Sequence, residues 1–248
     1  MFDAITKYGV TGRAEKSKVY QLYTWNPRNY TENSRKSVDD SPYGGGQGMV
    51  LLAAPLEKAI TDVKARLNSA GINETHVVYL SPQGRLLDYE KILELSRYNS
   101  LILVCGRYEG IDERFIERHV DEEISIGDYV ISGGELAAMI LIDSIVRHLP
   151  GTLGDNNSAK EDTFSNLLLE YPQYTRPEIY NGDAVPSVLL SGDHTKIKRW
   201  RLQQSLGKTW LNRPDLLAQK YIKGLSKEEE LLLEEFKQQQ DLKFQNRK

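Results

Sequence analysis

Three polar segments that carry glycine stand out as places where chemistry could occur. They are 81–84 (SPQG), 106–110 (GRYEG) and 125–135 (SIGDYVISGGE), and the first two follow the apolar runs 76–80 (HVVYL) and 101–105 (LILVC). Short apolar runs of this kind are typical of buried strands. Ligands bind at the carboxyl ends of strands in parallel α/β sheets, and glycine lets the backbone approach a ligand closely. Each segment alone could be a plain turn, but the three together favour one shared pocket.

The familiar nucleotide-binding signatures are absent. No G-x-G-x-x-G follows a predicted strand, which argues against a dinucleotide site. Gly207-Lys208-Thr209 resembles the end of a P-loop, but Leu202 stands where that motif requires glycine. The segment also follows a predicted helix rather than a strand. We therefore exclude both kinds of site.

A basic segment lies near the carboxyl end, although the net charge of the chain is -3. Residues 194–213 contain six Lys or Arg residues, no acidic residue, and the aromatic side chains Trp200 and Trp210. Cations for phosphates and aromatic faces for bases are the expected mixture for binding RNA. The alternative is a solvated basic helix. A second, looser basic set between residues 13 and 36 includes Arg28.

The cysteine count and the length of the apolar runs indicate the cellular compartment of the protein. The 248 residues include one cysteine, so an internal disulfide is impossible, which fits a reducing compartment. No apolar run reaches the roughly 18 residues that a membrane span needs. We expect a cytoplasmic protein without a membrane partner.

The pattern of apolar residues predicts an α/β fold with a mainly parallel sheet. Strands are expected at 18–25, 76–80, 101–105 and 129–131, and helices at 57–70, 88–97, 111–119 and 134–148. We expect residues 1–150 to form a ligand-binding domain and the polar segment 151–163 to be a flexible linker. Residues 164–248 should form a small helical domain with helices at 194–206, 214–222 and 226–243. Ser226 and Glu229 have the spacing of a capping box.

Longer motifs then point to a family. In order along the chain they are DDSPYGGGQGM, YLSPQGR, LILVCGRYEGIDER, DEEISIGDYVISGGELAAMILIDSIVR, SAKEDTF, YTRPE, VLLSGDH and RWRLQQSLGKTW. From Met1 to about Phe236, the chain closely resembles bacterial tRNA guanine-37 N1-methyltransferase. That family belongs to the trefoil-knotted, S-adenosylmethionine-dependent (SPOUT) class of enzymes.

The resemblance implies a trefoil-knotted sheet domain, a helical carboxyl-terminal domain, and a homodimer with active sites at the interface. It implies methyl transfer from S-adenosylmethionine to N1 of guanine 37, next to the anticodon of tRNA. It also suggests assistance by magnesium, although no carboxylate cluster indicates a site. Residue by residue, it assigns cofactor binding to Tyr79, Leu80, Ser81, Pro82, Gly106, Tyr108, Glu109, Gly110, Ser125, Ile126, Gly127, Asp128, Tyr129, Val130, Ile131, Gly133 and Gly134. Asp162 and Arg147 match the catalytic residues. The expected RNA contacts are Arg176, Lys196, Lys198, Arg199, Arg201 and Lys208.

The chemistry of guanine supports these roles. Its N1 carries a proton and is a poor nucleophile until that proton leaves, so Asp162 would act as the general base. Negative charge then develops on the ring, largely at O6, where the guanidinium of Arg147 would stabilise it. Read alone, Asp162 could be a loop acid or a helix cap, and Arg147 could interact with a helix dipole.

Two other functions compete with this hypothesis. Family members open with an apolar strand that ends in Phe-Pro-Glu, whereas this sequence opens at Met1-Phe2-Asp3-Ala4, which matches the residues after that strand. Either the start site is misassigned or this version lacks the strand. The loss of a strand suggests a catalytically silent RNA-binding protein on the same fold, against which Asp162 and Arg147 argue. A small-molecule α/β enzyme, such as a dehydrogenase, is the third hypothesis.

Overall fold

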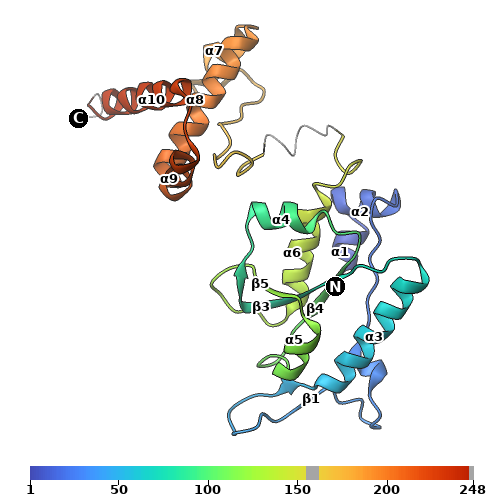
Figure 1. The fold of residues 1–248 in the computed structure, drawn as a ribbon. Helices are drawn as coiled ribbons and strands as arrows, with labels where there is room; N and C mark the ends of the chain where they lie inside the picture. Colours follow the sequence, from blue (N-terminus) through green and yellow to red (C-terminus); the bar gives the residue numbers. More distant parts are fainter. Residues whose placement is uncertain (155–161, 246–248) are drawn as a thin grey trace. The chain divides into compact units, whose positions relative to one another are not determined.

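The chain divides into two compact units, residues 1–156 and 157–248. The computed structural model describes residues 1–154 and 162–245, with side chains as far as residue 242. Most of the predicted linker, 155–161, therefore lies outside the described residues. Figure 1 shows both units, and each is described by itself below.

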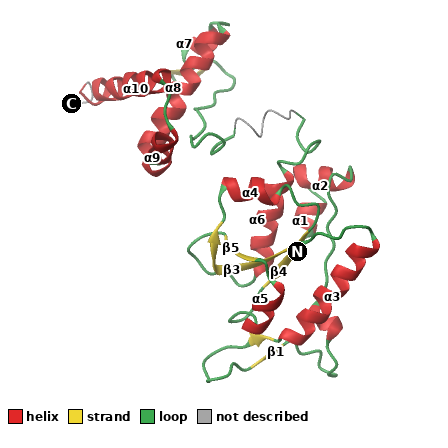
Figure 2. Cartoon of the chain, viewed as in Figure 1, coloured by secondary structure: helices red, strands yellow, loops and turns green. Residues whose placement is uncertain are grey.

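The first unit is built on a three-stranded sheet whose strands are all parallel. Its order is β4 (Leu101–Cys105), β3 (His76–Leu86) and β5 (Glu122–Ser125). The expected parallel α/β architecture is confirmed, and Figure 2 shows the strands surrounded by helices. The strand at 101–105 was predicted to the residue. A separate antiparallel pair joins β1 (Asp39–Asp40) to β2 (Val50–Leu51).

Alternating residues of the central strand β3 build two cores, one on each face of the sheet. Val77 and Tyr79 pack toward α3 (Ala53–Ser69) and α5 (Glu113–His119). Val78 and Leu80 pack toward α4 (Tyr89–Leu95) and α6 (Gly134–Val146). Because both faces are covered here, residues 77–80 of the strand are all buried and apolar rather than alternately polar. The short helices α1 (Asp3–Thr6) and α2 (Gly9–Lys16), which the sequence did not predict, pack against α6.

Two of the predicted strands are wrong. Residues 18–25 have no strand partner, because Val19, Tyr20 and Leu22 pack in the cluster formed with α6 instead of pairing in the sheet. The apolar residues at 129–131 also form no strand, and Tyr129 and Val130 are exposed. The chain leaves the sheet at Ser125 and turns at Gly127, where the backbone has a φ of +151° that disfavours other residues.

The second unit is mainly helical. It contains α7 (Ser187–Leu190), α8 (His194–Asn212), α9 (Pro214–Lys223) and α10 (Lys227–Gln245), with a two-residue hairpin formed by β6 (Ile179–Tyr180) and β7 (Asp183–Ala184). Its core consists of leucines. The capping box is confirmed: Ser226 N donates to Glu229 Oε2 at 2.9 Å, and Glu229 N donates to Ser226 Oγ at 3.2 Å.

Helix α8 extends six residues beyond the predicted end at 206. The glycine at 207 is the reason for the difference, because it serves as a packing site rather than a helix stop. A Cβ built at Gly207 would come within 2.4 Å of the Phe236 ring on α10. Along residues 1–154 and 162–245, no helix is long and apolar enough to cross a membrane.

The only cysteine of the chain, Cys105, ends β4 beneath the second glycine segment. Burial is the main cause that raises the pKa of its thiol from 9.0 to about 12, and the Glu135 carboxylate raises it further. Because the thiolate is the reactive form, this thiol is expected to be inert in the folded chain.

We predict that iodoacetamide at pH 8 alkylates Cys105 far more slowly in the folded chain than in urea. A pKa higher by about three units lowers the thiolate fraction roughly 1,000-fold. Mass spectrometry of tryptic peptides would measure both rates. A Ser34→Cys variant adds an exposed thiol as a matched control, which should react quickly without urea. Equal rates at Cys105 and at the added thiol would contradict the prediction.

Candidate functional site

The first glycine segment, 81–84, bulges out of strand β3 rather than following it as a loop. Leu80 and Arg85 both pair with Ile124 of β5, so the four residues between them leave the ladder. Ser81 is buried at the base of the bulge, where its Oγ accepts a hydrogen bond from Gln83 N at 3.2 Å. A Cβ on Gly84 would lie 2.3 Å from the carbonyl carbon of Glu123, so the bulge needs glycine there. Pro82 and Gln83 are thereby exposed at the carboxyl edge of the sheet.

The second segment, 106–110, is fixed through its main chain. Gly106 O accepts from Gly134 N at 2.8 Å, Glu109 N donates to Met49 O at 2.9 Å, and Gly110 O accepts from Leu51 N at 2.9 Å. Between these points Tyr108 has a φ of +60°, a left-handed conformation that costs a residue other than glycine about 1–3 kcal/mol. The fixed ends of the segment impose this conformation on Tyr108.

The third segment, 125–135, turns sharply and then starts α6. Ser125 Oγ donates to Gly127 O at 3.1 Å, and Gly127 N lies 3.2 Å from the same hydroxyl oxygen. At the start of α6, a Cβ on Gly134 would lie 2.8 Å from the Cα of Cys105. The helix therefore begins in direct backbone contact with the second segment.

These contacts place the three segments together at the carboxyl edge of the sheet. The Tyr79 ring, which is nearly buried, lies so close to Gly106 that a Cβ there would come within 2.9 Å of it. Burial raises the pKa of Tyr79, and the carboxylates of Glu123 and Glu113 raise it further, so its phenol stays protonated at neutral pH. The residues that the sequence assigned to cofactor binding lie on β3 directly before the bulge or within the three segments.

A cavity of about 410 Å³ adjoins the second segment. Its wall contains Cys105, Arg107, Tyr108, Ser132 and Glu135, together with residues of the amino-terminal part of the chain. Arg107 Nε donates to Glu135 Oε1 at 2.9 Å, which ties the second segment to the first turn of α6. Apolar side chains and a few charged groups are the usual lining of a small-molecule site.

The amino-terminal wall of this cavity is a strap, residues 21–36, that crosses α3. Trp25 Nε1 and Tyr30 Oη donate to Asp62 Oδ2 on α3 at 3.1 and 2.5 Å. These two donors lower the pKa of the Asp62 carboxyl. The guanidinium of Arg66 lies 4.3 Å from the centre of the Tyr23 ring. The strap is therefore fixed in place without being a strand.

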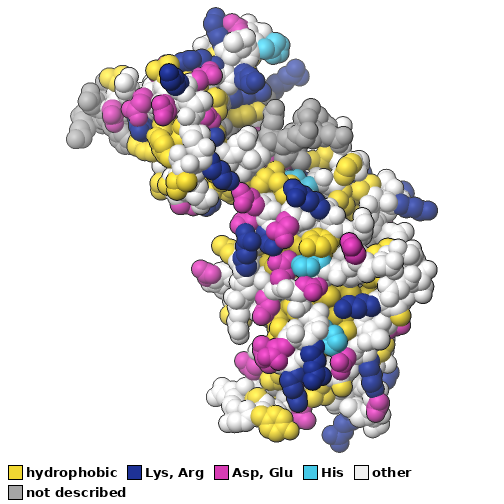
Figure 3. Space-filling model, in the orientation of Figure 1, with side chains coloured by type: hydrophobic (Ala, Val, Ile, Leu, Met, Phe, Trp, Pro, Cys, Tyr) yellow, Lys and Arg dark blue, Asp and Glu magenta, His cyan; other side chains and the backbone are white. Residues whose placement is uncertain are grey.

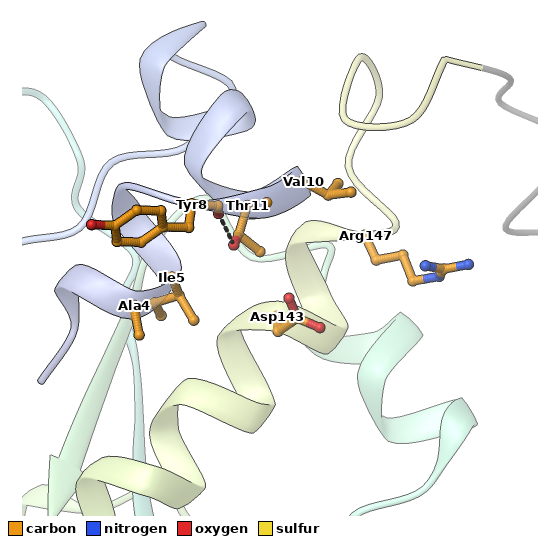
Figure 4. Close-up of a pocket in the computed structure, with 8 residues that line it drawn as sticks. Ala4, Ile5, Tyr8, Val10, Thr11, Asp143 and Arg147 are labelled. Carbon is orange, nitrogen blue, oxygen red and sulfur yellow. Dashed lines mark hydrogen bonds between the residues drawn. The ribbon is translucent and has the colours of Figure 1, made fainter.

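The structure places Arg147 at the other end of α6, away from the three segments. It follows the last residue of the helix and lines a second cavity, of about 370 Å³, formed with α1 and α2. Figure 4 shows Arg147 and Asp143 on α6 and Tyr8 on the opposite side of this cavity. Thirteen helical residues correspond to about 20 Å, so Arg147 lies about that far from Gly134.

Asp162 belongs to the second unit and is half-buried, and its carbonyl oxygen accepts from Ser165 N at 3.2 Å. Since Arg147 belongs to the first unit, the functional pairing of these two residues stays a prediction.

Helix α8 carries most of the residues assigned to RNA binding. Lys196, Lys198, Arg199 and Arg201 are exposed, and Arg176 is exposed beside the β6–β7 hairpin. Three of these cations also have partners within the unit. Lys196 Nζ lies 3.2 Å from Asp193 Oδ2, Arg199 Nη2 donates to Glu235 Oε1 at 2.8 Å, and Arg201 lies 4.8 Å from the centre of the Tyr171 ring. Lys208 is half-buried. Figure 3 shows Lys and Arg side chains gathered where α7 meets α8.

Sequence reasoning missed the strap as part of the ligand edge. Arg28 was assigned only to a loose basic set, yet it lines the cavity beside the second segment. Since 80 residues separate Arg28 from Tyr108, no local spacing could have indicated their contact. Among the described residues, no group of three or more His, Cys, Asp or Glu side chains is arranged to hold a metal ion.

Known proteins resemble this chain along most of its length. The family model described as "tRNA (Guanine-1)-methyltransferase TrmD" matches residues 1–219. A protein of Nitrosomonas europaea named tRNA (guanine-N(1)-)-methyltransferase is 66% identical over 96% of this chain and 88% of its own length. Proteins with the same name from Nitrosospira multiformis and Methylobacillus flagellatus are 64% and 55% identical, over 95% and 97% of this chain and 92% and 90% of their own lengths. The match covers both the sheet unit and most of the helical unit, and on this evidence the chain belongs to the TrmD family of tRNA (guanine-1)-methyltransferases.

Proposed function

We propose that this protein transfers a methyl group from S-adenosylmethionine to N1 of guanine 37, next to the anticodon of tRNA. The observation that carries the proposal is the convergence of three glycine-bearing segments at one edge of a parallel sheet, in a chain of the TrmD family. The names of the relatives support guanine N1 as the target. The resemblance of the motifs supports position 37.

The three segments fit a flat, polar cofactor. Close backbone contacts at Gly106 and Gly134, which any Cβ would disturb, leave main-chain groups near the edge rather than side chains. Tyr79 and Leu80 are buried on opposite faces of the sheet beneath this edge, and the exposed ends of the segments supply polar atoms. When bound, the cofactor supplies a methyl group activated by its attachment to a sulfonium. The residues that would hold it are those assigned above at the ends of the strands.

In the proposed reaction, the chemical task of this chain's own residues is to remove one proton from guanine N1. Asp162 would accept the N1 proton of the guanine, and Arg147 would stabilise the negative charge that this removal leaves on the ring. The remaining contribution is positioning, because N1 must lie in line with the methyl group at about 3–3.5 Å.

The geometry of α6 supports a homodimer with active sites at the interface. An arginine side chain cannot bridge the roughly 20 Å that separate the ends of this helix within one chain. A second copy could instead bring its Arg147 to the cofactor segments of the first. Leu136 and Ile140, one turn apart on α6, are exposed, as are the neighbouring Tyr129 and Val130. Apolar exposure on this scale suits contact with another protein surface.

We also propose the finer architecture of the family: a trefoil knot in the sheet domain 1–150 and a tRNA-binding domain at 164–248. On α8, the exposed cations would meet phosphates, and Trp200, half-buried and 6.4 Å from Tyr174, lies beside them.

The silent RNA-binding alternative has less support. Relatives that are 66% and 64% identical to this chain carry the enzyme's name, and Asp162 and Arg147 are both present. Transfer of tritiated methyl from S-adenosylmethionine to a tRNA transcript with guanine 37 tests the proposal directly. A transcript that differs only by adenine at position 37 is the matched control. The proposed function fails if the guanine transcript gains no more label than the adenine transcript.

Replacement of Asp162 by asparagine should reduce methyl transfer by at least 100-fold, because the amide keeps the shape but cannot accept the N1 proton. The affinity for S-adenosylmethionine should stay within a few-fold, since the cofactor residues belong to the other unit. Single-turnover kinetics and calorimetry measure the two effects separately. An active Asp162→Asn variant would remove this residue from the role of base.

The triple variant Lys198→Gln, Arg199→Gln, Arg201→Gln should bind tRNA more weakly, with a flatter dependence on salt. Each lost phosphate contact lowers the slope of log affinity against log salt by about 1. Lys227→Gln, an exposed lysine at the start of α10, provides the control. Filter binding at several salt concentrations gives the slopes. If slope and affinity match those of the control, α8 is only a solvated basic helix.

A further inference from the structure

Arg28 forms hydrogen bonds both within the strap and with the second segment. Its backbone is set by Asn26, whose Oδ1 accepts from Arg28 N at 3.0 Å at the start of the short helix η1 (Pro27–Tyr30). Its guanidinium is fixed at one end, because Nη1 donates to Lys36 O at 2.8 Å. At the other end Nη2 lies 3.3 Å from the phenolic oxygen of Tyr108, which accepts its hydrogen bond. The arginine thus connects the strap to the second segment.

Tyr108 is the residue of that segment that needs such support. The main-chain bonds of Gly106, Glu109 and Gly110 fix the ends of the segment, and Tyr108 between them is in the left-handed region. Its side chain is about half exposed at 48%, so packing alone does not fix the ring. The bond from Arg28 connects this side chain to the strap, which is itself held on α3 through Asp62.

We infer that Arg28 is a positioning residue for the methyl-transfer site: it orients Tyr108, and through Tyr108 the segment that would receive S-adenosylmethionine. The inference rests on the proposed function. A planar guanidinium suits this task, because its separate N–H groups can bond Lys36 O and Tyr108 Oη at once in a fixed geometry. The ammonium of a lysine has no such planar fork.

The alternative role for an arginine in this strap is contact with an RNA phosphate. That role predicts an effect on tRNA affinity and on its salt dependence, and none on the cofactor. The positioning role predicts the reverse. The two roles are therefore separated by measuring both affinities.

The experiment is a double-mutant cycle on Arg28→Ala and Tyr108→Phe, read by calorimetry with S-adenosylmethionine and by filter binding with tRNA. Each single change should weaken cofactor affinity about 10-fold. The double variant should be no weaker than the worse single variant, because both changes remove the same bond. At saturating cofactor, the kcat of the Arg28→Ala variant should stay within about two-fold. Arg28→Lys should recover only part of the affinity, since it keeps the charge but loses the fork.

The matched control is Arg97→Ala, which removes an exposed arginine at the opposite, amino edge of the same sheet. This variant should bind S-adenosylmethionine and tRNA as tightly as the unchanged chain. Circular dichroism checks that each variant is folded. If Arg28→Ala does not fold, the cofactor affinity of Tyr108→Phe tests the inference. Unchanged cofactor affinity in Arg28→Ala, or multiplicative losses in the double variant, would overturn the inference. A wild-type chain that binds no S-adenosylmethionine would instead overturn the proposed function, so the two failures are distinct.

Discussion

The hydrogen bond from Gly134 N to Gly106 O, 2.8 Å long, is the contact on which the rest of the site depends. It joins the first residue of α6 to the segment that follows β4, and it requires that neither glycine carries a side chain. A Cβ on Gly134 would approach the Cα of Cys105 to 2.8 Å, and a Cβ on Gly106 would approach the Tyr79 ring to 2.9 Å. Backbone atoms rather than side chains therefore border the place where a ligand would lie.

This contact also sets the direction of α6. A helix that starts at the carboxyl edge of a parallel sheet and packs back along it must end near the amino edge. Arg147 follows its last residue and meets α1 and α2 there, in a cavity separate from the cofactor segments. The fold thus keeps the two parts of the proposed chemistry apart within one chain. The proposed homodimer would bring them together.

The strap, residues 21–36, stabilises the second segment, which contains the strained residue Tyr108. Main-chain bonds hold the ends of residues 106–110, while Arg28 reaches the Tyr108 side chain from a distant part of the sequence. Asp62 on α3 holds the strap through two aromatic donors. Strain at one residue is thus supported by contacts from elements that are remote in sequence.

The sequence by itself determined the elements whose signals are local. Apolar runs predicted β4 to the residue and the start of β3. Helical periodicity predicted α4 to α6, α9 and α10 to within about two residues, and it predicted the presence of α3 and the start of α8. The capping spacing of Ser226 and Glu229 was confirmed. The long motifs also identified the family. These features depend on neighbours within a few positions, so a single sequence contains them.

Only the tertiary structure decided the features that depend on distant partners. Residues 18–25 have strand-like composition but pack against α6, and 129–131 are exposed because the chain turns at Gly127. The bulge at 81–84 exists because Leu80 and Arg85 share Ile124 as a partner. Arg28 and Tyr108 meet across 80 residues. In each case the deciding energy comes from packing or pairing with a segment far along the chain, and no local pattern encodes where that segment will lie.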